Sequence, residues 1–298
     1  MQGDCWLVLR GIVIKAFNSF YFVKTDDNVA MCTLRGRFKK NRFSLLVGDE
    51  VEYEPLAGGK GVIEAILPRR SLLKRPLVAN VDQVVLTFAA ANPTVSPILL
   101  DRFLVLTESS NLDAIICLNK IDLVNVEELK PLAALYREIG YPVILLSAKL
   151  GIGIDELRSY LLGKVTVFAG PSGAGKSTTL NAVQPGLSLA TGEVSKKIGR
   201  GKHTTRYAQL LPLDGGGFVV DTPGFSATDF REIDTSDLTL YFPEIRAAAS
   251  ECKFTSCLHY KEPQCAVKQA VQENRIHRSR YESYLSILEE IRDQKKGF

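Results

Sequence analysis

Hydrophobic and polar residues alternate over the first 67 residues, whereas apolar residues form continuous runs between residues 84 and 220. The alternating stretches are short, and turn residues such as Gly48-Asp49 and Gly58-Gly59 separate them, as is typical of β-strands. Five or so strands in about 65 residues predict a small closed barrel such as an OB-fold, whose face and loops commonly bind oligonucleotides. The expected strands include residues 6–9, 11–14, 20–23 and 49–53.

The continuous apolar runs predict parallel strands that are covered on both faces. These runs are residues 84–88, 114–118, 143–146, 165–168 and 217–220. Amphipathic helical patterns lie between them, at residues 98–107, 126–139 and 154–161. Alternating strands and helices indicate a doubly wound α/β domain.

The pattern changes again at two other points. Pro68-Arg69-Arg70 predicts a linker, and after about residue 230 the strands stop, with helices expected at 235–249 and over most of 265–296. We therefore expect a multidomain α/β protein with three parts. These are an OB-fold β-barrel suited to binding oligonucleotides (1–68), a doubly wound α/β domain (69–228) and a mostly helical domain (229–298).

Composition is that of an ordinary globular protein, with 46% hydrophobic and 23% charged residues. No apolar run approaches the roughly 18 residues of a membrane span, and the first residues lack a signal-peptide pattern. We expect a cytoplasmic protein that works as a monomer, without a membrane partner.

The P-loop pattern is Gly170-Pro171-Ser172-Gly173-Ala174-Gly175-Lys176-Ser177, followed by Thr178. It lies between an apolar strand and a helix, where backbone N–H groups surround phosphates and the helix N-terminus favours negative charge. Lys176 is expected to reach the β- and γ-phosphates, and Ser177 to bind Mg²⁺. The alternative is a Gly/Ser-rich turn that arises by chance.

Asp221-Thr222-Pro223-Gly224 follows the apolar run 217–220. We expect Asp221 to hold Mg²⁺ through a water and the Gly224 amide to sense the γ-phosphate. An acidic turn after a strand is common by itself, so this assignment depends on the P-loop.

Asn119-Lys120-Ile121-Asp122 and Ser147-Ala148-Lys149 predict that the base is guanine. The Asp122 carboxylate can accept hydrogen bonds from guanine N1–H and the exocyclic amine, a pattern that adenine does not present. Lys120 is expected to lie along the purine, and the Ala148 amide to donate to O6. Taken alone, Asp122 could instead be a helix N-cap.

The polar segment from 187 to 206 ends in His203-Thr204-Thr205-Arg206 and predicts a switch loop. We expect Thr205, or else Thr204, to complete the Mg²⁺ coordination. Phe225 occupies the position after Gly224 where many GTPases carry a catalytic glutamine, so His203 is the candidate for orienting water. His203 could equally be a solvated loop residue. Slow intrinsic turnover, raised by a partner, is the physical expectation.

Cys252, Cys257, His259 and Cys265 offer three thiolates and one imidazole within fourteen residues. That ligand set matches a closed tetrahedral site for one structural Zn²⁺, which would staple the small C-terminal domain. Buried free cysteines are the alternative, and a cytosolic setting disfavours disulfides. Cys5, Cys32 and Cys117 are isolated in apolar stretches and are interpreted as reduced core residues.

Two basic segments are candidates for RNA contact, although a solvated surface explains each of them as well. The first is a loop with Arg35, Arg37, Lys39, Lys40 and Arg42. The second is a helix with Arg275, His277, Arg278 and Arg280 beside Tyr281 and Tyr284.

The guanine-recognising motifs precede the P-loop, which is the reverse of the usual GTPase order. A circularly permuted GTPase between a small barrel and a Cys3His module resembles the RsgA (YjeQ/YloQ) family of ribosome-associated GTPases. Further stretches that carry the resemblance are 46–51, 68–70, 79–83 and 199–206. Gly173 stands where some related potassium-dependent proteins carry asparagine, so potassium dependence is not carried over.

The resemblance implies a factor that binds the small ribosomal subunit late in its maturation and hydrolyses GTP when the subunit stimulates it. It also implies that the barrel and the zinc module contact ribosomal RNA and that the histidine matching His203 acts in catalysis. The alternatives are a GTP-dependent RNA-binding adaptor in which hydrolysis is incidental, and a P-loop kinase. Because the chain runs from Asp221–Gly224 into the zinc domain, we expect γ-phosphate contacts to bias the orientation of that domain.

Overall fold

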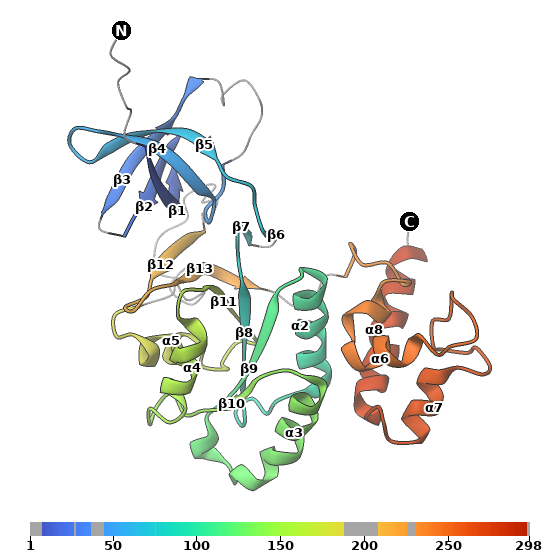
Figure 1. Ribbon diagram of the computed structural model, residues 1–298. Helices are drawn as coiled ribbons and strands as arrows, with labels where there is room; N and C mark the ends of the chain where they lie inside the picture. Colours follow the sequence, from blue (N-terminus) through green and yellow to red (C-terminus); the bar gives the residue numbers. More distant parts are fainter. Residues whose placement is uncertain are drawn as a thin grey trace. The chain divides into compact units, whose positions relative to one another are not determined.

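The structure is a computed structural model that describes residues 8–26, 28–36, 45–74, 76–187, 208–225 and 230–296 (Figure 1). Contacts between Cα atoms divide the chain into two compact units. The barrel unit comprises Met1–Gln83, Arg158–Phe168 and Gln184–Phe225, and the helical unit comprises Val84–Leu157, Ala169–Val183 and Ser226–Phe298. Both units therefore contain part of the α/β domain that the sequence predicts.

Five strands form a closed barrel at the start of the chain, as the sequence predicts (Figure 1). Their order is β1-β2-β3-β5-β4, and β4 pairs back with β1 to close the ring. β3 and β5 pair in parallel, and the other neighbours are antiparallel. The strands are β1 (Leu9–Phe17), β2 (Phe20–Lys24), β3 (Val29–Leu34), β4 (Glu50–Leu56) and β5 (Lys60–Ile66).

The first strand differs from the prediction of two short strands at 6–9 and 11–14. β1 runs without a break from Leu9 through Gly11. A Cβ added to Gly11 would lie 2.6 Å from Val23 Cγ1, so this glycine allows close approach of β2 instead of making a turn. Residues 6 and 7 lie outside the described residues.

The barrel unit also contains the strands that continue the sheet beyond the barrel. The order from there is β11-β13-β12-β1, and β12 pairs antiparallel with β13. A separate hairpin is formed by β6 and β7. The bounds are β6 (Leu72–Lys74), β7 (Leu77–Ala79), β11 (Val165–Ala169), β12 (Gln209–Pro212) and β13 (Phe218–Phe225).

The Pro68-Arg69-Arg70 segment, which the sequence predicts to be a linker, is held by side-chain hydrogen bonds. Arg69 makes two hydrogen bonds to the buried Asp49 carboxylate, at 2.6 and 2.8 Å. Arg70 donates to Asp82 at 2.7 Å. Asp49 precedes this segment in the sequence and Asp82 follows it, so composition alone does not reveal these hydrogen bonds.

The helical unit contains the first strands of the α/β domain, in the order β10-β9-β8, and β9 and β10 are parallel as predicted. Pro131 lies in the first turn of α3 and divides the predicted helix 126–139 into a 3-10 turn and an α-helix. The elements are β8 (Gln83–Ala89), β9 (Asp113–Asn119), β10 (Val143–Leu145), α2 (Pro97–Ser109), η1 (Ile121–Leu123), η2 (Val126–Leu129), α3 (Lys130–Ile139) and α5 (Lys176–Val183). The helix α4 (Ile154–Leu161) has the predicted bounds.

The C-terminal part is helical, as predicted, and packs around Phe242, Ile245, Tyr284 and Leu288. Pro243 begins α6 and divides the predicted helix 235–249 in the same way. Val105 of α2 belongs to the same core, so α2 supplies one wall of it. The elements are η4 (Leu238–Tyr241), α6 (Pro243–Ala249), α7 (Ala266–Gln272) and α8 (Arg278–Lys296).

Two residues of α8 are buried, although the sequence was interpreted as placing them on a surface that is solvated or contacts RNA. Arg280 is 1% exposed and Tyr284 is fully buried. Arg280 forms ion pairs with Asp101 and Glu244, because α8 packs against α2 and α6. Arg278, by contrast, is exposed and forms an ion pair along the helix with Glu282.

Among the residues that the structure describes, no helix combines the length and the apolar character needed to span a membrane.

Candidate nucleotide and metal sites

The P-loop leaves β11 at Ala169 and enters α5 at Lys176, as the sequence predicts. Two of its glycines are needed for close approach. A Cβ on Gly170 (φ 138°) would lie 2.0 Å from the Thr87 carbonyl oxygen, and one on Gly175 (φ 93°) would lie 2.3 Å from Asn119 Nδ2. The loop therefore packs against the ends of β8 and β9 in a conformation that side chains at these positions would block.

Lys176 and Ser177 begin α5 and are both half-buried, while Thr178 is exposed. The Lys176 ammonium donates to the carbonyl oxygens of Gly170 (2.8 Å) and Pro171 (2.9 Å). Burial lowers the pKa of Lys176 from its usual value. The ammonium is thus held over the loop, where a phosphate oxygen would compete with the carbonyls for it.

Asn119 connects the three motifs of the helical unit. Its Nδ2 donates to the Ala174 carbonyl at 3.0 Å, and its Oδ1 accepts from the amides of Lys120 (2.8 Å) and Ala148 (3.1 Å). Asn119 is buried at the end of β9. One side chain thereby aligns the P-loop, the Asn119–Asp122 motif and the Ser147–Lys149 motif. The Ala148 amide donates to Asn119 here, and its donation to guanine O6 stays a prediction.

Asp122 lies inside the turn η1, and Lys120 occupies the N-cap position of that turn. Asp122 is therefore not the N-cap of η1. The exposed Asp122 carboxylate accepts a hydrogen bond from Ser147 Oγ at 2.6 Å. Ser147 is fully buried, and Lys149 is exposed. The buried hydroxyl orients the carboxylate and leaves it accessible to a base.

Asp221 and Gly224 lie within β13, and not after its end as the sequence suggested. Asp221 is half-buried and opposite Gln209 of β12. The strand continues for four more residues through Phe225, beyond the register in which Phe218–Asp221 pair with β12. The predicted residues of the switch loop, His203, Thr204 and Thr205, lie outside the described residues.

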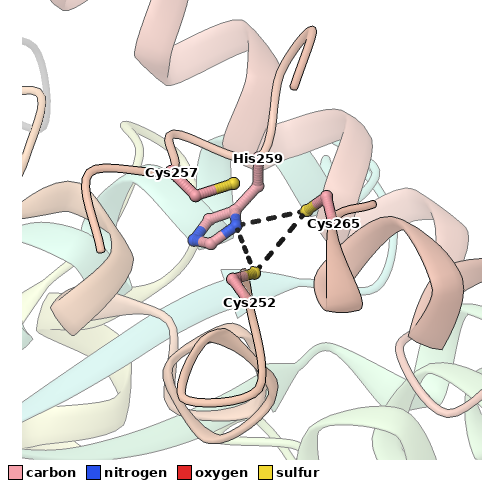
Figure 2. A group of neighbouring side chains, drawn as sticks. All are labelled: Cys252, Cys257, His259 and Cys265. Atoms are coloured by element: carbon pink, nitrogen blue, oxygen red, sulfur yellow. Dashed lines mark hydrogen bonds between the residues drawn. The ribbon is translucent and has the colours of Figure 1, made fainter. Parts of the chain in front are cut away.

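The four predicted zinc ligands come together in the helical unit (Figure 2). Their ligand atoms all lie within 4.8 Å of one another. Cys252 Sγ lies 3.9 Å from Cys265 Sγ, and His259 Nδ1 lies 3.5 and 3.4 Å from these two sulfurs. The sulfurs are well beyond the roughly 2.0 Å of a disulfide bond.

These separations fit a tetrahedral zinc ion. Metal bonds of about 2.3 Å to sulfur and about 2.0 Å to nitrogen place two sulfurs about 3.8 Å apart, and a sulfur and a nitrogen about 3.5 Å apart. Burial raises the pKa of the Cys257 thiol to about 12 and lowers the pKa of His259. The lowered pKa favours the neutral imidazole, which is the form that binds a metal, and the raised pKa of Cys257 means that an incoming ion has to displace the proton of that thiol.

The loop that carries His259 is held by side chains which are not ligands. Tyr281 and Tyr284 of α8 donate to the carbonyl oxygens of His259 (2.6 Å) and Leu258 (3.0 Å). Glu262 accepts from the amides of Leu258 and Tyr260. His259 itself adopts a positive φ of 55°. The turn thus has hydrogen-bond partners that orient its imidazole toward the three thiols.

Sequence reasoning missed Asn92 as a neighbour of the nucleotide site. The Lys120 ammonium donates to the Asn92 carbonyl oxygen. A Cβ on Gly173 would lie 3.5 Å from Pro93 Cδ, so the segment also borders the P-loop. An Asn-Pro pair directly after a buried strand, at the edge where the other motifs lie, was the available signal.

The closed barrel, the P-loop that follows the base-recognising motifs, and the Cys3His cluster together define a circularly permuted GTPase with two flanking domains. Family models agree with this class. The RsgA GTPase model matches residues 66–231, and the RsgA N-terminal domain model matches residues 10–63.

Individual relatives match over almost their full length. The small ribosomal subunit biogenesis GTPase RsgA of Moorella thermoacetica is 47% identical over 290 residues, covering 97% of this chain and 100% of the relative. The protein of the same name from Clostridium perfringens strain 13 is 48% identical over 283 residues, covering 95% and 98%. The chain belongs to the RsgA family, whose members are GTP hydrolases.

Solved structures give the same result. YjeQ from Thermotoga maritima has a TM-score of 0.86 and 41% identity, covering 96% of this chain and 99% of that one. YloQ, a circularly permuted GTPase, has a TM-score of 0.85 and 37% identity, covering 99% and 98%.

Proposed function

We propose that this protein binds the small ribosomal subunit and its RNA, assists its late maturation, and hydrolyses GTP when the subunit stimulates it. The observation that carries the proposal is the 47% identity to a small ribosomal subunit biogenesis GTPase over that protein's whole length. The Asn119 network supports it, because it joins a P-loop to a guanine-recognising motif. The protein acts as a monomer in the cytoplasm, with domains at 1–68, 69–228 and 229–298.

In this proposal GTP or GDP is bound with Mg²⁺. Lys176 binds the β- and γ-phosphates, and the amides of residues 170–178 surround them. Ser177 and Thr205 ligate Mg²⁺, with Thr204 as the alternative to Thr205, and Asp221 holds the ion through a water. The Gly224 amide contacts the γ-phosphate, and His203 orients the attacking water. Asn119, Lys120, Asp122 and residues 147–149 bind guanine.

Zn²⁺, when bound to Cys252, Cys257, His259 and Cys265, supplies a structural crosslink and no chemistry. Four protein ligands leave no open position for a substrate. The barrel and the C-terminal helical region are the RNA-binding parts.

The central test is GTP hydrolysis with purified small and large ribosomal subunits. We expect low basal turnover and a rise of at least about tenfold with small subunits only, since the chain lacks a glutamine after Gly224. Equal rates with and without properly folded small subunits would contradict the proposal. ATP bound more tightly than GTP would favour a kinase instead.

The adaptor alternative is separated by His203→Ala. If hydrolysis is part of the function, this variant binds the small subunit but is not released, and maturation stalls. An adaptor would keep full function with turnover abolished.

The role of Asp122 is tested by Asp122→Asn. An amide at this position donates where the carboxylate accepts, so GTP affinity should fall by about 100-fold or more. Xanthosine triphosphate, which presents a carbonyl in place of the exocyclic amine, should bind better to the variant than GTP does. Asp113→Asn is the control, because Asp113 is exposed at the opposite end of β9. If Asp122→Asn kept the base preference of the wild type, Asp122 would not be part of the base-binding site.

A further inference from the structure

The two flanking regions are attached to the GTPase elements by different means. We propose that the nucleotide state, sensed at β13, is transmitted through β12 to strand β1 of the barrel, while a buried ionic cluster keeps the C-terminal helices bound to α2 in both nucleotide states. This inference rests on the proposed function, in which Asp221 and Gly224 of β13 respond to Mg²⁺ and the γ-phosphate. It differs from the expectation that the zinc domain is the part whose orientation changes.

The first observation is the position of β12, which lies between the strand that carries Asp221 and the first strand of the barrel. Gln209 is opposite Asp221 of β13 on one side and opposite Lys15 of β1 on the other. From Gln209 to Pro212, every residue of β12 has a partner in β13. A change in β13 therefore acts on a strand that is itself paired with the barrel.

Strand β1 is divided between two roles. Residues from Leu9 to Ile12 pair with β4 and close the barrel, whereas Lys15 pairs with Gln209. The register between β1 and β2 shifts between Val13 and Lys15. Such an irregularity bends a strand and locally weakens its ladder. The second half of β1 can thus respond to β12 without opening the barrel core.

A second attachment of the barrel runs through the segment after it. The buried Asp49 binds Arg69, and Asn80 donates to the Gly48 carbonyl at 2.9 Å. Asp82 accepts from the Val165 amide at 2.7 Å and donates its own amide to the Val165 carbonyl at 2.9 Å. The barrel is thereby joined to β11 as well as to β12, so it is coupled to the strands of its own unit at two places.

The C-terminal helices are attached to α2 by buried charges. Arg280 donates to Asp101 Oδ1 of α2 (2.5 Å) and to Glu244 of α6 (2.6 and 3.2 Å). Tyr136 of α3 donates to the same Asp101 oxygen at 2.6 Å. The Arg280 guanidinium also lies 4.6 Å from the centre of the Phe242 ring. We call Asp101, Tyr136, Glu244 and Arg280 the α2 hub.

Separating α8 from α2 would break the Arg280–Asp101 ion pair and leave the buried Asp101 carboxylate without its counter-charge. Arg280 and Asp101 are 1% and 0% exposed, so water does not replace the lost interactions until the helices are well apart. Burial lowers the pKa of Arg280, but attraction to Asp101 and Glu244 outweighs it and the net shift is upward. A second ion pair, Arg102 with Glu290, adds to the attachment. The hub favours one arrangement of α8 on α2.

The test is hydrogen exchange of the full-length, zinc-loaded protein with GDP and with a non-hydrolysable GTP analogue, both with Mg²⁺. We expect peptides covering β12 and residues 13–17 of β1 to exchange about threefold or more slowly with the analogue, since fixing β13 reduces local opening. Peptides covering α2 and residues 278–288 should exchange equally in the two states. The opposite pattern would overturn the proposal.

Variants of the α2 hub sharpen the test. Arg280→Met should speed exchange in residues 278–288 about tenfold or more with either nucleotide and leave the β1 response intact. Arg278→Met is the matched control, because the Arg278 side chain is 85% exposed. This variant should change neither the exchange in residues 278–288 nor the response of β1. If Arg280→Met abolished the β1 response while the peptide covering residues 170–183 stayed protected by nucleotide, the signal would pass through the hub and the proposal would be wrong.

Failure of this inference is distinguishable from failure of the proposed function. Protection of residues 170–183 by guanine nucleotide, with no response in β1, overturns the inference and leaves ribosome-stimulated hydrolysis unaffected. A β1 response without stimulation by small subunits overturns the proposed function and supports the inference. No protection of residues 170–183 by either nucleotide counts against both.

Discussion

The barrel and the C-terminal helical region are of similar size, but they are stabilised differently. In the barrel, every strand pairs with two neighbours around a closed ring, and the core consists mainly of aliphatic side chains such as Val13, Val51 and Ile63. In the C-terminal region, an apolar core is flanked by two polar clusters, the candidate metal site of Cys252, Cys257, His259 and Cys265 and the α2 hub. Among the residues of this region that the structure describes, no backbone ladder connects the helices.

This difference shows where each region is vulnerable. A closed ladder satisfies backbone groups locally and needs no particular side chain to do so. The C-terminal helices depend instead on individual thiols, an imidazole and one guanidinium. No side chain of similar size can replace any of these groups. Conditions that act on metal binding or charge should therefore disrupt the C-terminal region while the barrel stays folded.

The largest effect is expected from removing the metal. Cys257→Ser, or treatment with a zinc chelator, should unfold residues 252–265 and loosen α8, because metal binding in small sites is worth about 10–16 kcal/mol. Zinc content and hydrogen exchange measure this, and β1 to β5 should be unaffected. Ser256→Ala is the control, since Ser256 is exposed beside Cys257. Equal loss of protection in the barrel would show that the two regions do not differ in this way.

The next largest effect is expected at the α2 hub. Arg280→Met leaves the carboxylates of Asp101 and Glu244 without their counter-charge and should lower the free energy of unfolding by about 3–5 kcal/mol. Urea unfolding followed by tyrosine fluorescence would measure the loss. Arg278→Met should change the free energy by less than about 0.5 kcal/mol. Similar losses in the two variants would mean that the hub contributes little.

The barrel should be sensitive to backbone geometry instead. Gly48→Ala places a Cβ 2.0 Å from the Ala79 carbonyl oxygen at a φ of 91°. Strain and overlap together should cost about 3 kcal/mol. Gly58 also has a positive φ (74°) but no atom near its Cβ position, so Gly58→Ala should cost only about 1 kcal/mol. The difference in urea midpoint between Gly48→Ala and Gly58→Ala measures the effect of the overlap with the Ala79 carbonyl oxygen. Equal midpoints would show that this overlap has no effect on stability.

The smallest effect concerns acid. Burial raises the pKa of Glu262, but hydrogen bonds from backbone amides, including those of Leu258 and Tyr260, outweigh it and the net shift is downward. Glu262 therefore stabilises the loop that carries His259 at pH values above the unfolded-state pKa of Glu262, and this contribution is lost as pH falls through its lower folded-state pKa. Glu262→Gln should cost about 1 kcal/mol at pH 7 and show a weaker acid dependence. Glu251→Gln is the control, because Glu251 is exposed directly before Cys252, and it should cost less than about 0.5 kcal/mol at pH 7.

Local patterns were sufficient wherever the partners are close in the chain. The bounds of α4 were predicted from helical periodicity, and the apolar runs predicted β8, β9 and β11 to within a residue or so. The Cys252–Cys265 ligands lie within fourteen residues, so spacing alone brought them together. The distant motifs 119–122, 147–149 and 170–177 converge because each follows a strand of one sheet.

The sequence alone determined the class of protein, the closed barrel and the grouping of Cys252, Cys257, His259 and Cys265, because glycine patterns, strand periodicity and close spacing are local requirements of the backbone. Only the tertiary structure decided that Arg280 is buried against Asp101, 179 residues away, and that Arg69 binds Asp49. It also placed Gln209 between Asp221 and Lys15. A charged side chain looks the same in a sequence whether water or a buried carboxylate surrounds it, because the free energy that decides between them comes from packing of distant segments.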